Sequence, residues 1–115
     1  MTVRFVDRDV DALLVVDTGA QRTLIRPRLA LRLGVDTAQP LRWERLVGVG
    51  ETQPVPVVQL ARVQVGSSLL NGLLASVYDF SPGIPADGLL GPSFLSHFRA
   101  TFEFDTETLV LRATL

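Results

Sequence analysis

The stretch "LLVVDTGAQRT", residues 13–23, decides how the rest of the chain is interpreted. Four consecutive aliphatic residues lead into Asp17, and Thr18 and Gly19 follow at once. A continuous apolar run of this kind predicts a strand that is buried on both faces. Glycine permits a tight turn and a close approach to its N–H, and threonine adds a short, stiff hydroxyl. We therefore expect the strand to end in a rigid turn that holds the Asp17 carboxylate.

Composition narrows the possible classes of protein. With 115 residues, 47% hydrophobic and 20% charged, we expect one globular domain over residues 1–115. The formal charge of −1 gives no broad attraction to nucleic acid or to anionic membranes. The chain has no cysteine and one histidine, so the usual zinc ligand sets are missing, and we expect no metal and no cofactor. Without a membrane-span-length apolar run or a signal-peptide core, the chain as given reads as cytoplasmic; a longer parent protein would change that expectation.

The N-terminal third predicts a hairpin followed by a short helix. Residues 3–6 and 13–16 are rich in strand formers and flank a turn-like acidic cluster, which favours a β-hairpin. In "RPRLALRLG", Pro27 occupies a probable first helical position and Gly34 a typical stop position. We expect at most a short helix between them.

The middle of the chain has the pattern of strand, glycine-rich turn and strand, over residues 43–65. Pro54 and Pro56 cannot donate hydrogen bonds to a ladder, so this hairpin should form an edge or a projecting arm. At the end of the second strand, Ala61, Val63 and Val65 alternate with polar residues, which predicts that they share one buried face.

Two turn signals compete in the next segment. "GSS" at residues 66–68 and "NG" at residues 71–72 each favour a turn, so "LLNGLLASVYD" is either a pair of strands or one long strand. Further on, Ser93 is a possible N-cap and Phe94 with Phe98 forms an i, i+4 apolar pair, which predicts a helix of two or three turns. Two β-rich halves around "DTET" end the chain.

A single carboxylate does little for peptide hydrolysis, whereas a pair of carboxylates can act as acid and base. Two that lie about 3 Å apart cannot both ionise comfortably, so they share a proton. One then accepts a proton from water while the other donates one. Asp17 is the only aspartate followed by Thr-Gly or Ser-Gly, so the chain supplies one such group.

Three segments, in this order and spacing, resemble the retropepsin-like aspartic proteases. "VVDTGAQRTLI" resembles the family's active-site loop, "LVGVGETQPV" its glycine-containing flap, and "ADGLLGPSFL" the signature that precedes its C-terminal helix. The resemblance implies a mainly β fold: a single-lobed acid-protease β-barrel with a flap hairpin and one short C-terminal helix. Two departures are Gln21, where many members carry Ser or Thr although Thr23 fits the retroviral spacing, and a flap without tyrosine, with Trp43 upstream.

The resemblance also implies roles for individual residues. Asp17 is expected to be the catalytic carboxylate. Support of the active-site loop is expected from Thr18, Gly19 and Ala20; flap and substrate-binding positions are Val47, Gly48, Val49 and Gly50; and packing under the loop is expected from Leu89, Leu90 and Gly91.

The implied function is that of an aspartic endopeptidase. Because the chain has one Asp-Thr-Gly, the resemblance implies a homodimer in which Asp17 of each subunit meets on a two-fold axis and activates water. Terminal strands such as "TVRFV" and "TLVLRATL" suit an interface like that of retroviral relatives. The substrate would be a protein or peptide bound as an extended strand, and no cofactor is implied. The alternative is an inactive dimerisation or peptide-binding module with the same fold.

Simpler structural interpretations apply to several residues. Asp17 by itself is compatible with a carboxylate that only stabilises a turn. Asp87 is expected to anchor a turn, and His97 to lie at or near the surface. Arg26, Arg28 and Arg32 are expected to form a solvated face.

Overall fold

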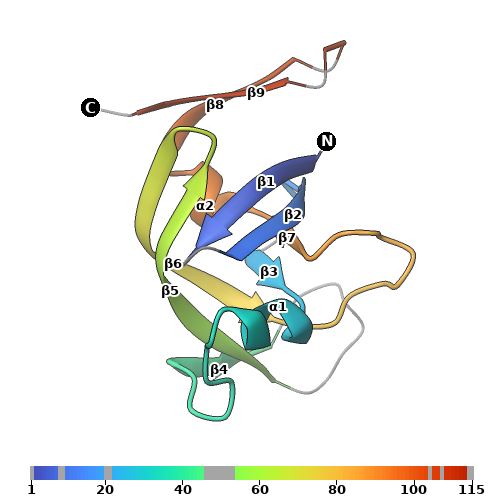
Figure 1. The fold of residues 1–115 in the computed structure, drawn as a ribbon, viewed down its shortest axis with the longest axis vertical. Coiled ribbons are helices and arrows are strands. Elements are labelled where there is room, and N and C mark those ends of the chain that lie inside the picture. Colours follow the sequence, from blue (N-terminus) through green and yellow to red (C-terminus); the bar gives the residue numbers. More distant parts are fainter. Residues whose placement is uncertain are drawn as a thin grey trace.

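The fold is dominated by strands, as the sequence predicts. The computed structural model describes residues 2–7, 10–19, 22–45, 54–103, 105, 106 and 108–113. Its strands are β1 (Thr2–Asp7), β2 (Val10–Val16), β3 (Thr23–Ile25), β4 (Arg42–Glu44), β5 (Val55–Val65), β6 (Ser68–Val77), β7 (Gly88–Leu90), β8 (Phe98–Glu103) and β9 (Thr108–Ala113). The helices are α1 (Pro27–Arg32) and α2 (Pro92–Leu95) (Figure 1).

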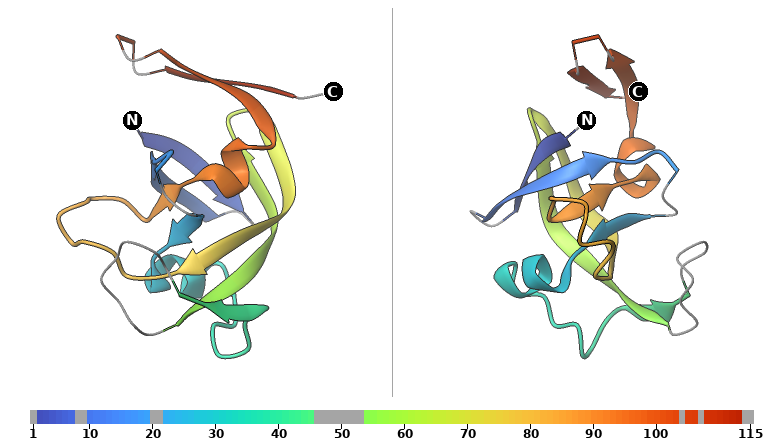
Figure 2. Two further views of the ribbon diagram at one scale, coloured as in Figure 1. Left: turned by 180° about the vertical axis from the view of Figure 1, so that it is seen from behind. Right: turned by 90° about the vertical axis from the view of Figure 1, so that its right-hand side faces the viewer.

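Seven of these strands form one strongly curved sheet in the order β1-β2-β7-β3-β6-β5-β4. One residue pair, Val6 with Gln64, also joins β1 to β5, so the sheet curls toward a barrel. The remaining strands, β8 and β9, form a separate two-stranded ribbon. This ribbon extends beyond the curved sheet in every view (Figures 1 and 2). The predicted β1–β2 hairpin, the edge position of β4 and the final strand pair are confirmed.

Between β5 and β6, the structure decides between the two competing turns. The chain turns at Gly66, which has a φ of 61°, and β6 then runs as one long strand. Gly72 lies inside β6 with a φ of 74°, so "NG" distorts a strand rather than forming a hairpin. The prediction that Ala61 is buried is wrong: Leu60 is buried and Ala61 is exposed. Leu60 and Arg62 of β5 pair with the residues on either side of Gly72 in β6. Opposite this distortion, the regular alternation of buried and exposed residues along β5 is interrupted.

The two helices differ in how well their sequences predict them. α1 begins at Pro27, and Gly34 follows it with a φ of 72°, as expected. α2 is a single turn whose N-cap is Gly91, so the predicted longer helix with Ser93 as its cap is wrong. The Ser93 hydroxyl instead accepts a hydrogen bond from the Thr23 N–H and donates one to the Leu74 carbonyl oxygen, each at 3.1 Å. Phe98 belongs to β8 and still contacts Phe94, with ring centroids 5.0 Å apart.

β7 lies in the interior of the sheet, between β2 and β3. It pairs in parallel with β2 and antiparallel with β3, and it packs so closely that glycine is required at its start. A Cβ on Gly88 would lie 2.4 Å from the Leu24 carbonyl oxygen, and one on Gly91 would lie 2.9 Å from the Arg22 carbonyl group. Both contacts are with backbone, which cannot rotate away as a side chain can. Glycine at these positions therefore sets how near the strands approach.

Gly88→Ala is expected to lower the free energy of unfolding by about 1–3 kcal/mol, because the new methyl group would force β7 away from β3. Gly83→Ala is the matched control, since a Cβ there meets only the Ser81 hydroxyl at 3.6 Å. Urea unfolding followed by circular dichroism measures both. Equal midpoints for the two variants would show that β7 tolerates the added carbon.

Ser93→Ala should also destabilise the fold by about 1–3 kcal/mol, because it leaves a buried N–H without its acceptor. That N–H belongs to Thr23, which is fully buried. Ser96→Ala, at an exposed position after α2, serves as the control. A loss no greater than that of Ser96→Ala would contradict the structural role of the Ser93 hydroxyl.

Candidate active site

Asp17 follows directly after β2, in the turn that the sequence predicts. The prediction that this strand is buried on both faces is wrong, because Leu13 is 44% exposed. The Asp17 N–H donates to the Leu90 carbonyl oxygen at 2.9 Å, and its Oδ1 accepts the Gly19 N–H at 3.0 Å. The residue is half-buried, while Thr18 and Gly19 are exposed. The sheet therefore holds the backbone of Asp17, and the turn holds one oxygen of its carboxylate. The turn itself lies at the protein surface.

Leu89 and Leu90, which are predicted to pack under this loop, belong to the neighbouring strand β7, and Gly91 follows that strand. Val15 pairs with Leu89 and Val16 with Leu90, so β7 runs alongside the strand that delivers Asp17. Leu90 is fully buried in the main core, and Leu89 packs against a smaller cluster. Gly91 is also buried. The structure therefore brings the first and the last of the three sequence signatures together.

A buried hydroxyl joins these two signatures. The Thr23 Oγ1 accepts the Gly91 N–H at 3.1 Å, and Thr23 has no exposed surface. Together with the Ser93 hydroxyl, it satisfies backbone groups where β3, β7 and α2 meet. The sequence distinguishes Thr23 only by its spacing from the Asp17 motif, and it predicts that Ser93 caps a helix. Nothing local to either residue signals a partner some 70 positions away.

After the turn that holds Asp17, Arg22 links the chain to β4 through a network of ion pairs. Arg22 Nη2 lies 2.7 Å from Glu44 Oε2, and Arg42 Nε lies 2.6 Å from Glu44 Oε1. The hydrogen bond from Arg42 lowers the pKa of Glu44 below its ordinary value of 4.5; burial opposes this shift and the charge of Arg22 assists it. Trp43, beside these residues on β4, is 55% exposed.

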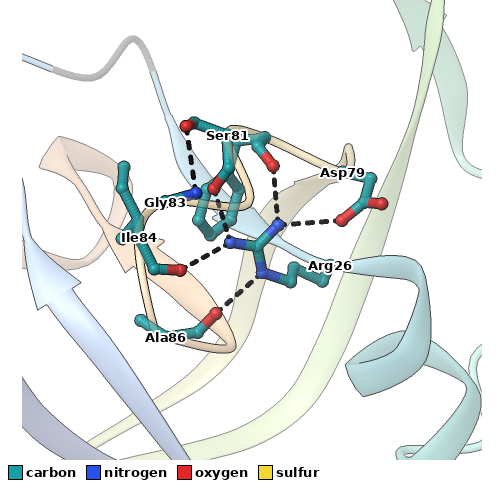
Figure 3. A network of polar contacts seen from close by, with 7 residues as sticks. Arg26, Asp79, Ser81, Gly83, Ile84 and Ala86 are labelled. Carbon is teal, nitrogen blue, oxygen red and sulfur yellow. Dashed lines mark hydrogen bonds and ion pairs between the residues drawn. The ribbon is translucent and has the colours of Figure 1, made fainter.

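Arg26 does not belong to a solvated face, so that prediction is wrong for this residue. Arg28 and Arg32 are exposed as expected, but the Arg26 side chain is only 16% exposed. Its guanidinium points into the loop between β6 and β7, where carbonyl oxygens surround it (Figure 3). The sequence gives no local sign of this, because the loop that receives the side chain lies more than fifty residues further along the chain.

The simpler interpretations of Asp87 and His97 are confirmed. Asp87 anchors the end of its loop on β2: its Oδ2 accepts the Leu13 N–H at 2.9 Å, and its own N–H donates to the Leu13 carbonyl oxygen at 2.8 Å. His97 is exposed. Neither residue contacts Asp17 through any hydrogen bond within the described part of the chain.

Several predicted site residues lie outside the described residues, namely Ala20, Val47, Gly48, Val49 and Gly50. Within residues 10–19, 22–45 and 54–103, no hydrogen bond or ion pair brings a second carboxylate to Asp17. Among the residues that the structure describes, no group of three His, Cys, Asp or Glu side chains could hold a metal. The helices in the same part of the chain include none long and apolar enough to cross a membrane.

Comparison with known proteins identifies the family of the chain. A sequence model of the family described as "Aspartyl protease" matches residues 1–94, which is most of the chain. The chain belongs to the aspartyl protease family. A search of curated proteins found no match for the chain.

Solved structures show that the chain has a retropepsin-like fold. It is similar to a retropepsin-like aspartic protease from Rickettsia conorii, with a TM-score of 0.74 and 22% identity, over 96% of this chain and 80% of the other. The retroviral protease-like domain of Ddi1 from Leishmania major matches with a TM-score of 0.66 and 16% identity, over 100% and 94% of the two chains. A foamy viral protease-reverse transcriptase matches with a TM-score of 0.61 and 16% identity, over 86% of this chain and 12% of the other. The predicted family and fold class are confirmed.

Glu44→Gln is expected to give a pH-dependent loss of stability. A lowered pKa stabilises the folded state above the ordinary value of 4.5, and this contribution disappears as the pH falls through the lowered value. The urea midpoint of the variant should therefore lie below that of the wild type at pH 7 and approach it at pH 3. Glu103→Gln, at an exposed position on β8, is the control. A difference that stays constant from pH 7 to pH 3 would contradict the assignment of the network to Glu44.

Proposed function

We propose that this aspartyl protease is an endopeptidase that acts as a homodimer and activates water between two copies of Asp17. The observation that carries the proposal is the state of Asp17 in one subunit. At the end of β2, its carboxylate accepts the Gly19 N–H and its own N–H binds the Leu90 carbonyl oxygen, its turn is exposed, and no hydrogen bond or ion pair brings a second carboxylate of the described residues to it. A site of this kind is half of a carboxylate pair.

The proposed chemistry follows from the proximity of two such groups. Two carboxylates about 3 Å apart share one proton, so at working pH one is ionised and the other protonated. The ionised Asp17 accepts a proton from the attacking water, and the protonated one donates its proton to the oxygen of the scissile carbonyl. The proton taken from water then passes to the leaving amine nitrogen as the C–N bond breaks, and one hydroxyl of the tetrahedral intermediate returns its proton to the second Asp17, which restores the pair.

The surface around Asp17 suits a two-fold contact. Thr18 and Gly19 are exposed on the same turn, so a second subunit can approach the carboxylate directly. In the proposed dimer, the Thr18 hydroxyl braces the two loops, and the Gly19 N–H, which already binds Asp17 Oδ1, keeps the carboxylate in place. Ala20, which the resemblance predicts to support the loop, lies outside the described residues. The strand-forming termini, β1 and β9, are the segments expected to extend the interface.

The proposed substrate is an extended peptide that lies across the dimer as an added strand. The predicted flap residues Val47, Gly48, Val49 and Gly50 would cover it and exclude water from the reacting bond. The two valines would favour apolar side chains near the cut. If the chain instead serves as an inactive dimerisation or peptide-binding module, it will bind peptides and pair without turnover.

Asp17→Asn is expected to abolish peptide cleavage between about pH 4 and 7, because an amide cannot accept or share the proton. A diverse peptide mixture analysed by mass spectrometry is the assay, and a statine-type inhibitor should suppress the wild-type cleavage. Asp36→Asn is a matched control, since Asp36 Oδ1 accepts the N–H two residues on at 2.9 Å, as Asp17 Oδ1 does at 3.0 Å. Cleavage that persists in Asp17→Asn would remove Asp17 from the mechanism. Intact peptides with both proteins would favour the binding module.

Mixing the two proteins tests whether the site is shared between subunits. A fixed amount of wild type is equilibrated with increasing Asp17→Asn protein, which converts active homodimers into mixed dimers with one carboxylate. Activity should then fall in proportion to the wild-type fraction, whereas a self-sufficient subunit would keep constant activity. Addition of Asp36→Asn protein should raise activity instead. A molecule that remains monomeric in sizing experiments while it cleaves peptides would overturn the shared site.

A further inference from the structure

The guanidinium of Arg26 lies at the centre of the loop of residues 78–87, which connects β6 to β7 (Figure 3). It donates to five oxygens at 2.7–3.0 Å: Asp79 Oδ1 and the carbonyl oxygens of Phe80, Ser81, Ile84 and Ala86. Its central carbon also lies 3.7 Å from the centre of the Phe80 ring. All five N–H donors of the guanidinium are therefore used.

This arrangement makes the shape of the loop depend on one side chain. Within the loop, residues 78–87 form no strand or helix, and Pro82 and Pro85 cannot donate backbone hydrogen bonds. Four carbonyl dipoles point at a common centre, where they would repel one another without a cation between them. The fork of donors on Arg26 supplies that cation in a fixed geometry, which a lysine cannot reproduce.

The loop in turn fixes where β7 begins. The Arg26 N–H donates to the Asp87 carbonyl oxygen at 2.9 Å, so both the backbone and the side chain of Arg26 hold the end of the loop. Asp87 is bound to Leu13 of β2 through two further hydrogen bonds. The first residue of β7, Gly88, follows immediately and pairs with Leu14.

The position of β7 in turn determines where its last carbonyl oxygen lies, and this oxygen binds the Asp17 N–H. β7 has three residues, which pair in register with Leu14 to Val16, and its last carbonyl oxygen accepts the Asp17 N–H. Parallel strands need a long connection, so their register is not set by a tight turn as in a hairpin. We propose that Arg26 is a positioning residue for Asp17, acting through the β6–β7 loop and the register of β7. The proposal rests on the peptidase function proposed above.

Arg26→Met is expected to reduce kcat by about 10- to 100-fold and to change KM less, since a small displacement of a catalytic group is costly even when it originates elsewhere. Arg26→Lys should recover part of the loss, because an ammonium offers three donors in place of five. Arg28→Met, at an exposed position two residues along on α1, is the matched control and should keep wild-type kinetics. Equal kcat values for Arg26→Met and Arg28→Met would overturn the proposal.

A second measurement is independent of peptidase activity. Hydrogen exchange followed by NMR should show that the Asp17 amide loses protection in Arg26→Met while amides of the β5–β6 ladder keep theirs, because the effect is transmitted by β7. Uniform loss across the protein would mean that Arg26 is only a general stabiliser, and retained protection at Asp17 would also overturn the proposal. A wild type without cleavage would count against the proposed function alone, since the exchange result still decides the role of Arg26.

Chemical rescue covers a variant that folds poorly. Arg26→Gly leaves the oxygen cradle without its cation, and millimolar methylguanidinium should restore Asp17 protection and, where the wild type is active, cleavage. Methylammonium at the same concentration is the control, because it lacks the planar fork. Equal effects of the two cations would show that charge alone, rather than the geometry of Arg26, holds the loop.

Discussion

The structure depends on the insertion of a three-residue strand, β7, between β2 and β3. The insertion brings a backbone carbonyl to the end of β2, where it accepts the Asp17 N–H, and so converts a strand terminus into a fixed point. It also explains the glycines of the "DGLLG" signature, since a side chain at Gly88 would collide with the backbone of β3. A strand this short makes few hydrogen bonds of its own, and neighbouring groups must hold it.

Those neighbours are polar and lie at both ends of β7. At the start, Arg26 and Asp87 fix the loop against α1 and β2; at the end, Thr23 and Ser93 satisfy backbone groups that would otherwise be buried without partners. Apolar packing beneath, with Leu90 and Phe94 fully buried, favours burial but does not select a register. The hydrogen bonds supply that selection, because each is satisfied in only one alignment.

The features that the sequence predicts correctly have local causes. The run before Asp17, the turn at Gly19, and the Pro27 start and Gly34 end of α1 each follow from residues within a few positions of one another. The predictions of a solvated Arg26 and of a helix cap at Ser93 fail because Asp79, a partner of Arg26, lies 53 residues further along the chain and Thr23, the donor to Ser93, lies 70 residues before it. The prediction that Ala61 is buried depends on regular alternation along β5, which Gly72 on the neighbouring strand disturbs. Contacts made by the fold as a whole leave no periodic signal.

In the proposed dimer, rigidity within a subunit is what allows the pair of subunits to do chemistry. Two carboxylates brought close together repel when both are ionised, and they share a proton only if neither can move away. A flexible turn would relieve the repulsion by separating them. The bond from the Asp17 N–H to Leu90, and the bond from Gly19 to the carboxylate, oppose that movement. Contacts across the interface would supply the free energy that brings the two carboxylates together. The hydrogen bond to β7 would keep the Asp17 loop from moving and separating them again.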